Sequence, residues 1–110
     1  MQLRRGNLFV DADPPPTGER FEDVRRHGRL QIERIVSSGQ PDTSDDRQTQ
    51  DEWVVLLAGQ ATLVVAGERV DLVAGDHLWL PAGTEHRVER TSDGALWLAV
   101  HLHPEIAPVD

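Results

Sequence analysis

The feature that most constrains the fold is a series of short β-rich runs, each closed by turn residues, that fills the chain from Leu30 onward. The runs cover residues 30–36, 53–58, 61–66, 69–73, 77–80, 87–91 and 96–102. Turns that contain glycine, such as Gly59-Gln60 and Gly67-Glu68, separate them. Short strands at near-regular spacing are typical of an antiparallel sandwich or barrel. We therefore expect an all-β fold with no helix after residue 29.

The first 29 residues differ in character from the rest of the chain. The three prolines at 14–16 exclude helix and central strand there, because each lacks an N–H donor and has a fixed φ. Residues 19–27 can form a short helix, since a capping threonine precedes them and a glycine follows them. We expect an irregular or short-helical arm over residues 1–29, packed on a barrel face or a neighbouring subunit. The β-domain would then span residues 30–110.

Composition excludes several kinds of chemistry. The 110 residues suffice for one domain, and the absence of cysteine excludes disulfides, thiolate zinc sites and cysteine nucleophiles. All 11 basic residues are arginine, so a lysine Schiff base is excluded too. A net charge of -8 repels phosphate backbones, and we expect no nucleic-acid partner. No apolar run approaches the ~20 residues that a membrane span needs, and no apolar run of signal-peptide length follows the N-terminus. We therefore expect no membrane partner and a cytoplasmic location.

A glycine-proline-glycine-histidine pattern lies in the second half of the chain. Five residues separate Gly75 from Pro81, one separates Pro81 from Gly83, and two separate Gly83 from His86. The spacing places a short strand between two tight turns, and the second turn directs His86 toward the barrel interior. This segment resembles the second conserved motif of the cupin superfamily, and it matches that motif completely.

A second segment is similar to the first cupin motif, but only in part. Glu52 precedes Gly59 by six residues, as in the second half of that motif. Metal-binding cupins carry a His-x-His pair ahead of the glutamate, whereas this chain has Asp46 and Gln48 there, or Asp45 and Arg47 if the loop is one residue longer. The resemblance covers about residues 48–102. It implies a cupin-type double-stranded β-helix, a jelly-roll barrel, of the small single-domain bacterial kind with a degenerate first motif.

The resemblance implies a site at the mouth of the barrel, centred on His86 and Glu52. Both would be catalytic, and together with Gln48 they would hold a divalent metal such as Mn, Fe, Ni or Zn; the oxygen-rich donor set favours Mn(II). Asp46, Asp51 and His101 are weaker candidates for the substrate pocket. We expect no nucleotide or organic cofactor.

Two kinds of function stay open, besides a closed barrel that serves only as an oligomeric scaffold. The first is a metal-dependent enzyme, a dioxygenase, isomerase or decarboxylase that acts on a small polar molecule. The second is a sensor that binds a small molecule in a metal-free pocket without turnover. We expect a homodimer in either case, because jelly rolls leave strand edges that pairing across a two-fold axis covers.

The His101-Leu102-His103 segment places two imidazoles on one face of a strand. The alternation of leucine and valine at 96, 98, 100 and 102 places the apolar face opposite. The histidines then share a face with Trp97 and Ala99, which we expect to be the outer or subunit-contact face.

Overall fold

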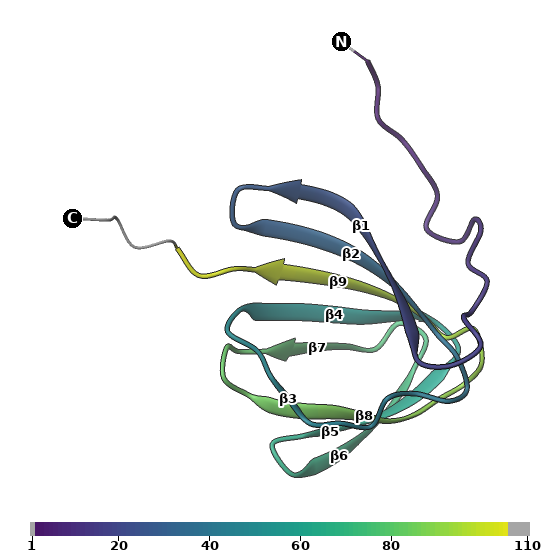
Figure 1. Ribbon diagram of the computed structural model, residues 1–110, viewed down its shortest axis with the longest axis vertical. Coiled ribbons are helices and arrows are strands. Elements are labelled where there is room, and N and C mark those ends of the chain that lie inside the picture. Colours follow the sequence, from purple (N-terminus) through teal and green to yellow (C-terminus); the bar gives the residue numbers. More distant parts are fainter. Residues whose placement is uncertain (1, 106–110) are drawn as a thin grey trace.

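The fold consists of two antiparallel β-sheets. A computed structural model describes residues 2–105, and within them it contains nine strands and no helix (Figure 1). The strands are β1 (Glu19–His27), β2 (Leu30–Ser37), β3 (Asp46–Arg47), β4 (Asp51–Ala58), β5 (Gln60–Val65), β6 (Glu68–Val73), β7 (His77–Leu80), β8 (Glu85–Thr91) and β9 (Leu96–Leu102). The prediction of an all-β jelly roll is confirmed. Since residues 2–105 hold no helix, none of them belongs to a helix that could cross a membrane.

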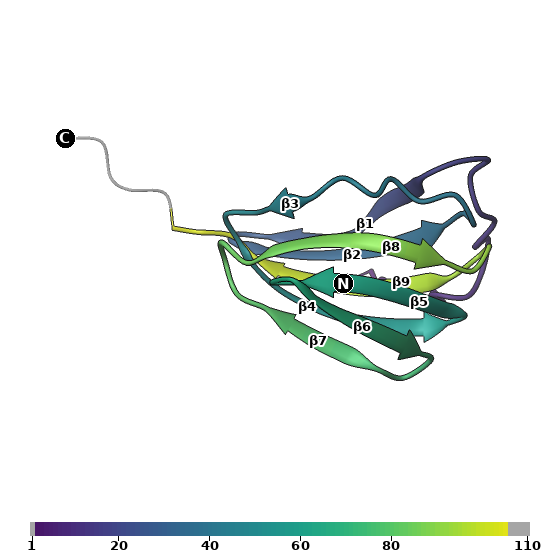
Figure 2. The same ribbon diagram turned by 90° about the horizontal axis from the view of Figure 1, so that it is seen from below.

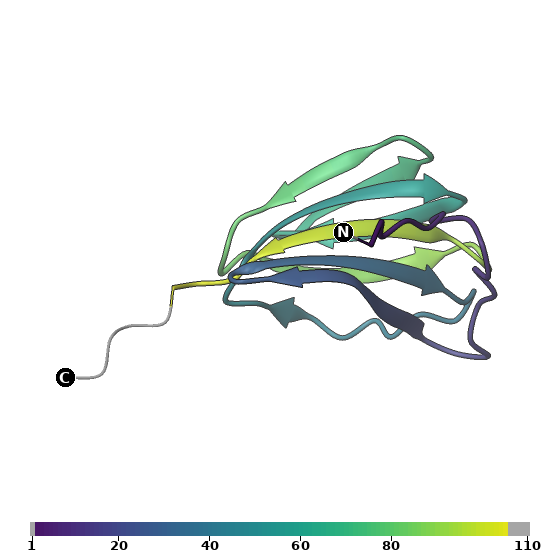
Figure 3. The same ribbon diagram turned by 90° about the horizontal axis from the view of Figure 1, so that it is seen from above.

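The two sheets form the walls of a flattened barrel. One sheet has the order β1-β2-β9-β4-β7 and the other the order β3-β8-β5-β6 (Figure 2). The chain passes from one sheet to the other after β2, β3, β4, β6, β7 and β8, which gives the jelly-roll connectivity. The outer faces of β1, β2 and β9, and the chain before β1, are seen from above in Figure 3.

The expectation of a short helix over residues 19–27 is wrong, because this segment is the edge strand β1. It pairs with β2 from Glu19↔Ser37 to His27↔Leu30, and Gly28 makes the connecting turn at a φ of 57°. A glycine in the left-handed region suits a hairpin turn as well as a helix end, so the stop signal did not distinguish them. A register shift between Asp23 and Arg25 also interrupts the period-two pattern that would have indicated a strand.

The chain before β1 packs on the outer face of the five-stranded sheet. Arg34 of β2 is buried, and its guanidinium donates to the carbonyl oxygens of Leu8, Val10 and Asp11 at 3.1, 2.5 and 3.2 Å. The same group pairs with Glu22 of β1 at 2.9 Å. These bonds satisfy a buried charge and anchor the arm to a barrel face.

The core lies between the two sheets and includes one face of β9. Leu56, Leu63, Leu72, Leu80 and Trp97 belong to it.

Ala99 and His101 are buried on the same face as Trp97, whereas Leu98 and Val100 are only half-buried on the other face. The expectation that the histidine face is an outer or subunit-contact face is therefore wrong. β9 lies between β2 and β4, and both of its faces carry apolar side chains, so alternation could not identify the interior one.

Candidate functional site

A cavity of about 520 Å³ opens between the sheets. Its apolar wall comes from both sheets and includes Val54, Leu63, Val88 and Trp97. Its polar wall comes from the strands around β9 and from the loop before β4, which contributes Asp42 and the residues that follow it. An apolar chamber with a few convergent polar groups is the usual form of a small-molecule site.

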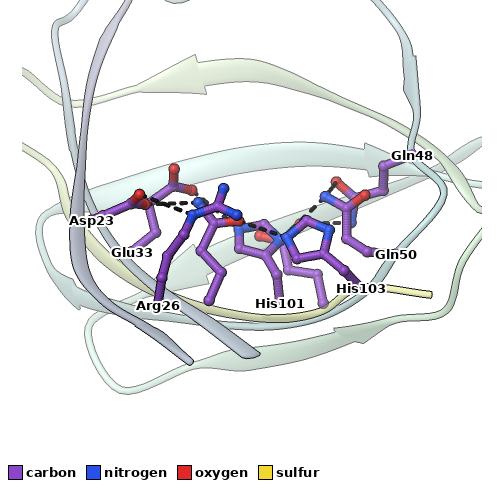
Figure 4. Close-up of polar contacts among 9 residues, drawn as sticks. Asp23, Arg26, Glu33, Gln48, Gln50, His101 and His103 are labelled. Carbon is purple, nitrogen blue, oxygen red and sulfur yellow. Dashed lines mark hydrogen bonds and ion pairs between the residues drawn. The ribbon is translucent and has the colours of Figure 1, made fainter. Parts of the chain in front are cut away.

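His101 is one of three groups in this wall whose pKa is shifted, together with Glu19 and Asp42. Its Nε2 lies 3.1 Å from Oε1 of Glu33, and its Nδ1 lies 4.0 Å from Oε1 of Glu52 (Figure 4). The hydrogen bond to Glu33 and the charges of Glu52 and Glu33 raise the pKa of His101, although burial acts in the opposite direction. The sheet order explains the arrangement, because β9 lies between β2 and β4 and His101 is directly opposite Glu52.

Two glutamines extend this arrangement into a polar network. Gln48 donates from Nε2 to Oε1 of Glu52 at 2.8 Å, and its own Oε1 accepts from Gln50 at 3.3 Å. The Nε2 of Gln50 also lies 3.3 Å from Nδ1 of His101. Gln48 and Glu52, both expected at the site from their motif positions, are thus in direct contact, and Gln50 connects them to His101 (Figure 4).

His86 lines the same cavity from the opposite sheet. It is half-buried on β8, and its Nδ1 lies 3.1 Å from the carbonyl oxygen of Thr84, which leaves Nε2 for other partners. Asp46 also lines the cavity and is the cross-strand partner of His86.

Asp51 is the one residue of the expected set outside the cavity wall. Its Oδ1 accepts a hydrogen bond from the backbone N–H of Ala82 at 2.9 Å. The carboxylate thereby supports the turn that precedes β8.

The expected metal ligands do not form a metal centre as they lie. Among residues 2–105, no group of three or more histidine, cysteine, aspartate or glutamate side chains is placed to hold a metal ion. Gln48 turns its amide nitrogen, a donor, toward Glu52. His86 uses one ring nitrogen on Thr84. A set with one imidazole, one carboxylate and an amide facing the wrong way is a weak fit to a divalent ion, so the metal site stays a prediction.

Three acidic residues of the cavity wall were not expected from the sequence: Glu33, Glu19, and Asp42 of the loop after β2. Glu33 holds His101, and its position within the apolar strand β2 was the only signal available. Glu19 lies at the start of β1 and accepts a hydrogen bond from Ser37 Oγ at 2.6 Å. Burial raises the pKa of Glu19, and the hydrogen bond from Ser37 offsets part of that effect.

A second set of contacts leads from His101 to the surface. The rings of His101 and His103 stack with their centroids 6.0 Å apart. His103 Nε2 lies 2.7 Å from Gln31 Oε1, and Gln31 donates to Asp23 at 2.7 Å. The Gln31 bond and that from Arg26 hold the pKa of Asp23 below its usual range.

The fold and this interior site are those of a cupin. The family described as "Cupin domain" matches residues 33–103, and the chain belongs to this family. A Ralstonia eutropha JMP134 protein, whose name proposes that it is a mannose-6-phosphate isomerase, is 35% identical with a TM-score of 0.85; the match covers 93% of this chain and 100% of that one.

Two further solved structures share the fold at lower identity. A cupin superfamily protein of Desulfitobacterium hafniense DCB-2 is 18% identical with a TM-score of 0.77, covering 94% of this chain and 95% of that one. An RmlC-like cupin of Desulfovibrio desulfuricans is 17% identical with a TM-score of 0.78, covering 92% and 97%. The chain matches no curated protein.

Proposed function

We propose that this cupin binds a small polyhydroxylated molecule in the cavity and isomerises it by proton transfer, without a metal ion. The observation that carries the proposal is the burial of His101 between Glu33 at 3.1 Å and Glu52 at 4.0 Å in the cavity wall. A buried histidine with two carboxylates in a concave site is an arrangement suited to acid–base chemistry. The relative from Ralstonia eutropha, whose name proposes a mannose-6-phosphate isomerase, supports the reaction class.

In this proposal Glu52 is the general base. It takes the proton from the carbon next to the substrate carbonyl, while His86 gives a proton to the carbonyl oxygen, which produces an enediol. Glu52 then returns its proton to the neighbouring carbon, and His86 recovers a proton from the second hydroxyl group. Protons and electrons balance over the cycle, and no redox partner is needed.

His101 and Glu33 support this chemistry without contacting the reacting carbon. Glu33 favours the protonated imidazole, which places a positive charge 4.0 Å from Glu52. A fixed positive charge beside the substrate stabilises negative charge that develops on the substrate oxygen. Gln48 fixes the rotamer of Glu52 through the 2.8 Å bond to Oε1.

Deuterium exchange tests the proposal. The chain is incubated in D2O with mannose or fructose, and proton NMR follows the loss of the signal from hydrogen next to the carbonyl group. We expect exchange with the parent chain, none with Glu52→Gln, and unchanged exchange with Glu85→Gln, whose exposed carboxylate pairs with Arg47. Binding to the cavity without exchange would favour the sensor alternative. The absence of both binding and exchange would overturn the proposal.

We further propose that the chain is a homodimer joined through the outer face of the five-stranded sheet. Trp79 on the edge strand β7 is 57% exposed and lies beside Trp53 of β4 in the sheet register. Leu102 at the end of β9 is also exposed. Exposed aromatic side chains next to an open strand edge favour an interface.

A further inference from the structure

We propose that the cavity selects molecules without negative charge, so that it excludes phosphate esters and favours an amine-bearing polyol over its uncharged counterpart. This inference rests on the proposed function only in taking the same cavity as the ligand site. It concerns what the cavity accepts and does not require turnover.

Carboxylates dominate the polar wall of the cavity. Six of them line it, and they come from four strands and the loop between β2 and β3: Glu19, Glu33, Asp42, Asp45, Asp46 and Glu52. Two hydrogen bonds from Ser44 hold the pKa of Asp42 below its usual range, so this carboxylate is ionised at neutral pH. A ligand that enters the cavity therefore meets negative charge at the loop as well as in the interior.

Two of the three described groups of the wall that can carry positive charge, Arg87 and His101, already pair with carboxylates, and the third is His86, whose Nε2 is left for a ligand. Arg87 is the only arginine that lines the cavity within residues 2–105, and its NH1 lies 3.4 Å from Oδ1 of Asp45. His101 lies between Glu33 and Glu52, so its charge is matched by two carboxylates. The buried Arg34 is turned to the outer face of the sheet, where it binds the arm. A phosphate group would find no free guanidinium and would face several carboxylates.

Glu52 provides a ligand acceptor in the interior. Its side chain is 9% exposed, and it lines the cavity. Oε1 accepts the amide of Gln48 at 2.8 Å, but among the described residues no hydrogen bond reaches Oε2. The Oε2 atom of this largely buried side chain can therefore accept from a ligand, and an ammonium or hydroxyl group supplies the donor.

The relative from Ralstonia eutropha makes the inference specific. Its name proposes a phosphorylated sugar as substrate. A phosphate monoester carries about −1.5 to −2 charges at neutral pH, which is the least suitable charge for this wall. We therefore expect the present chain to bind mannosamine most tightly, mannose less tightly and mannose 6-phosphate least.

Two nitroxide probes of the same size measure the selectivity without any assumption about turnover. One probe carries an aminomethyl group and the other a carboxylate. Paramagnetic relaxation of the backbone amides of Val54 and Leu63 reports how often each probe enters the cavity. Because the whole chain carries a charge of -8, the amide of Gly67 at the remote β5–β6 turn provides the reference for general attraction of cations.

We expect the ratio of cationic to anionic relaxation to be several-fold higher at Val54 and Leu63 than at Gly67, on the order of the tenfold enrichment that charged clefts produce. Asp42→Asn combined with Asp46→Asn should lower the cavity ratio and leave that at Gly67 unchanged. An equal ratio at the cavity and the turn would overturn the inference, as would tighter binding of mannose 6-phosphate than of mannose in a chemical-shift titration. Failure of the exchange assay alone would refute the isomerase and leave this inference standing.

Discussion

Replacing Glu33 with glutamine is the most direct perturbation of the interior network. Glu33→Gln keeps the size of the side chain and an acceptor oxygen for His101, but it removes the charge. The two side chains are 14% and 8% exposed, so solvent screens their interaction only weakly. A hydrogen bond to a charged group contributes about 1.5–3 kcal/mol and one between neutral groups about 0.5–1.5 kcal/mol. We therefore expect the variant to lose about 1–2 kcal/mol of its free energy of unfolding near pH 6.

The loss should depend on pH in a defined direction. The hydrogen bond that His101 donates to Glu33 raises the pKa of His101 above the usual histidine value of about 6.5. The stabilisation is then fully present below pH 6.5, where the unfolded chain also has a protonated histidine, and it declines as pH rises through the higher pKa of the folded state. The difference between parent and variant should accordingly be largest near pH 6 and smaller at pH 9.

Urea unfolding at a series of pH values from about 5.5 to 9 measures this difference, provided that the slope m is the same in both proteins. A parallel NMR titration should show a lower pKa for His101 in Glu33→Gln. Glu85→Gln is the matched control, because its carboxylate pairs with Arg47 at 2.6 Å on the surface, where such pairs contribute little. An energy difference independent of pH, or a His101 pKa unchanged by Glu33→Gln, would refute the reasoning.

Three other predictions concern the fold, the metal and the assembly. Gly59→Ala should lower the free energy of unfolding by about 2 kcal/mol more than Gly67→Ala does. Both glycines have a positive φ (88° and 82°), but only at Gly59 would the added Cβ lie 2.6 Å from Ser92 Oγ. Thermal unfolding of the two variants tests this. Elemental analysis after incubation with Mn, Fe, Ni and Zn salts should find far less than one ion per chain in both the parent and His86→Ala. Near-stoichiometric metal in the parent that is lost in the variant would instead establish the metal centre. Sedimentation should show that Trp79→Asp dissociates the dimer while Val73→Asp, at a site equally exposed on the other sheet (56% against 57%), does not; a monomeric parent would contradict the dimer.

Sequence patterns located the β-domain strands because each one ends at residues with a distinct backbone requirement. Glycines with positive φ close the turns after β4, β5 and β6, so the strand ends were predictable to within one or two residues. Two strands, β3 and β1, were not predicted. β3 has only two residues, too few for any period to appear. β1 is mostly charged and contains a register shift, so helical signals outweighed the strand pattern.

The site was predictable only where a motif named its residues. His86, Glu52 and Gln48 all line the cavity, as expected from the cupin resemblance. Glu33 could not be found in this way, because it is 68 residues from His101 and reaches it only through the sheet order that places β2 beside β9. The orientation of His101 was misjudged for a related reason: a central strand with apolar residues on both faces does not indicate which face is inside.

The interior network and a divalent metal at Glu52 would have opposite effects on the protonation of His101. A metal ion on this carboxylate would lie a few ångströms from Nδ1 of His101, which is 4.0 Å from Oε1 of Glu52. Its two positive charges would disfavour the imidazolium that Glu33 and Glu52 stabilise. Gln48 now occupies one of the positions where metal-binding cupins carry a histidine, and its neutral amide fixes Glu52 without adding charge. If metal did bind at Glu52, the His101 pKa would have to fall, so an NMR titration of His101 with and without added Zn(II), which is diamagnetic, would detect the conflict directly.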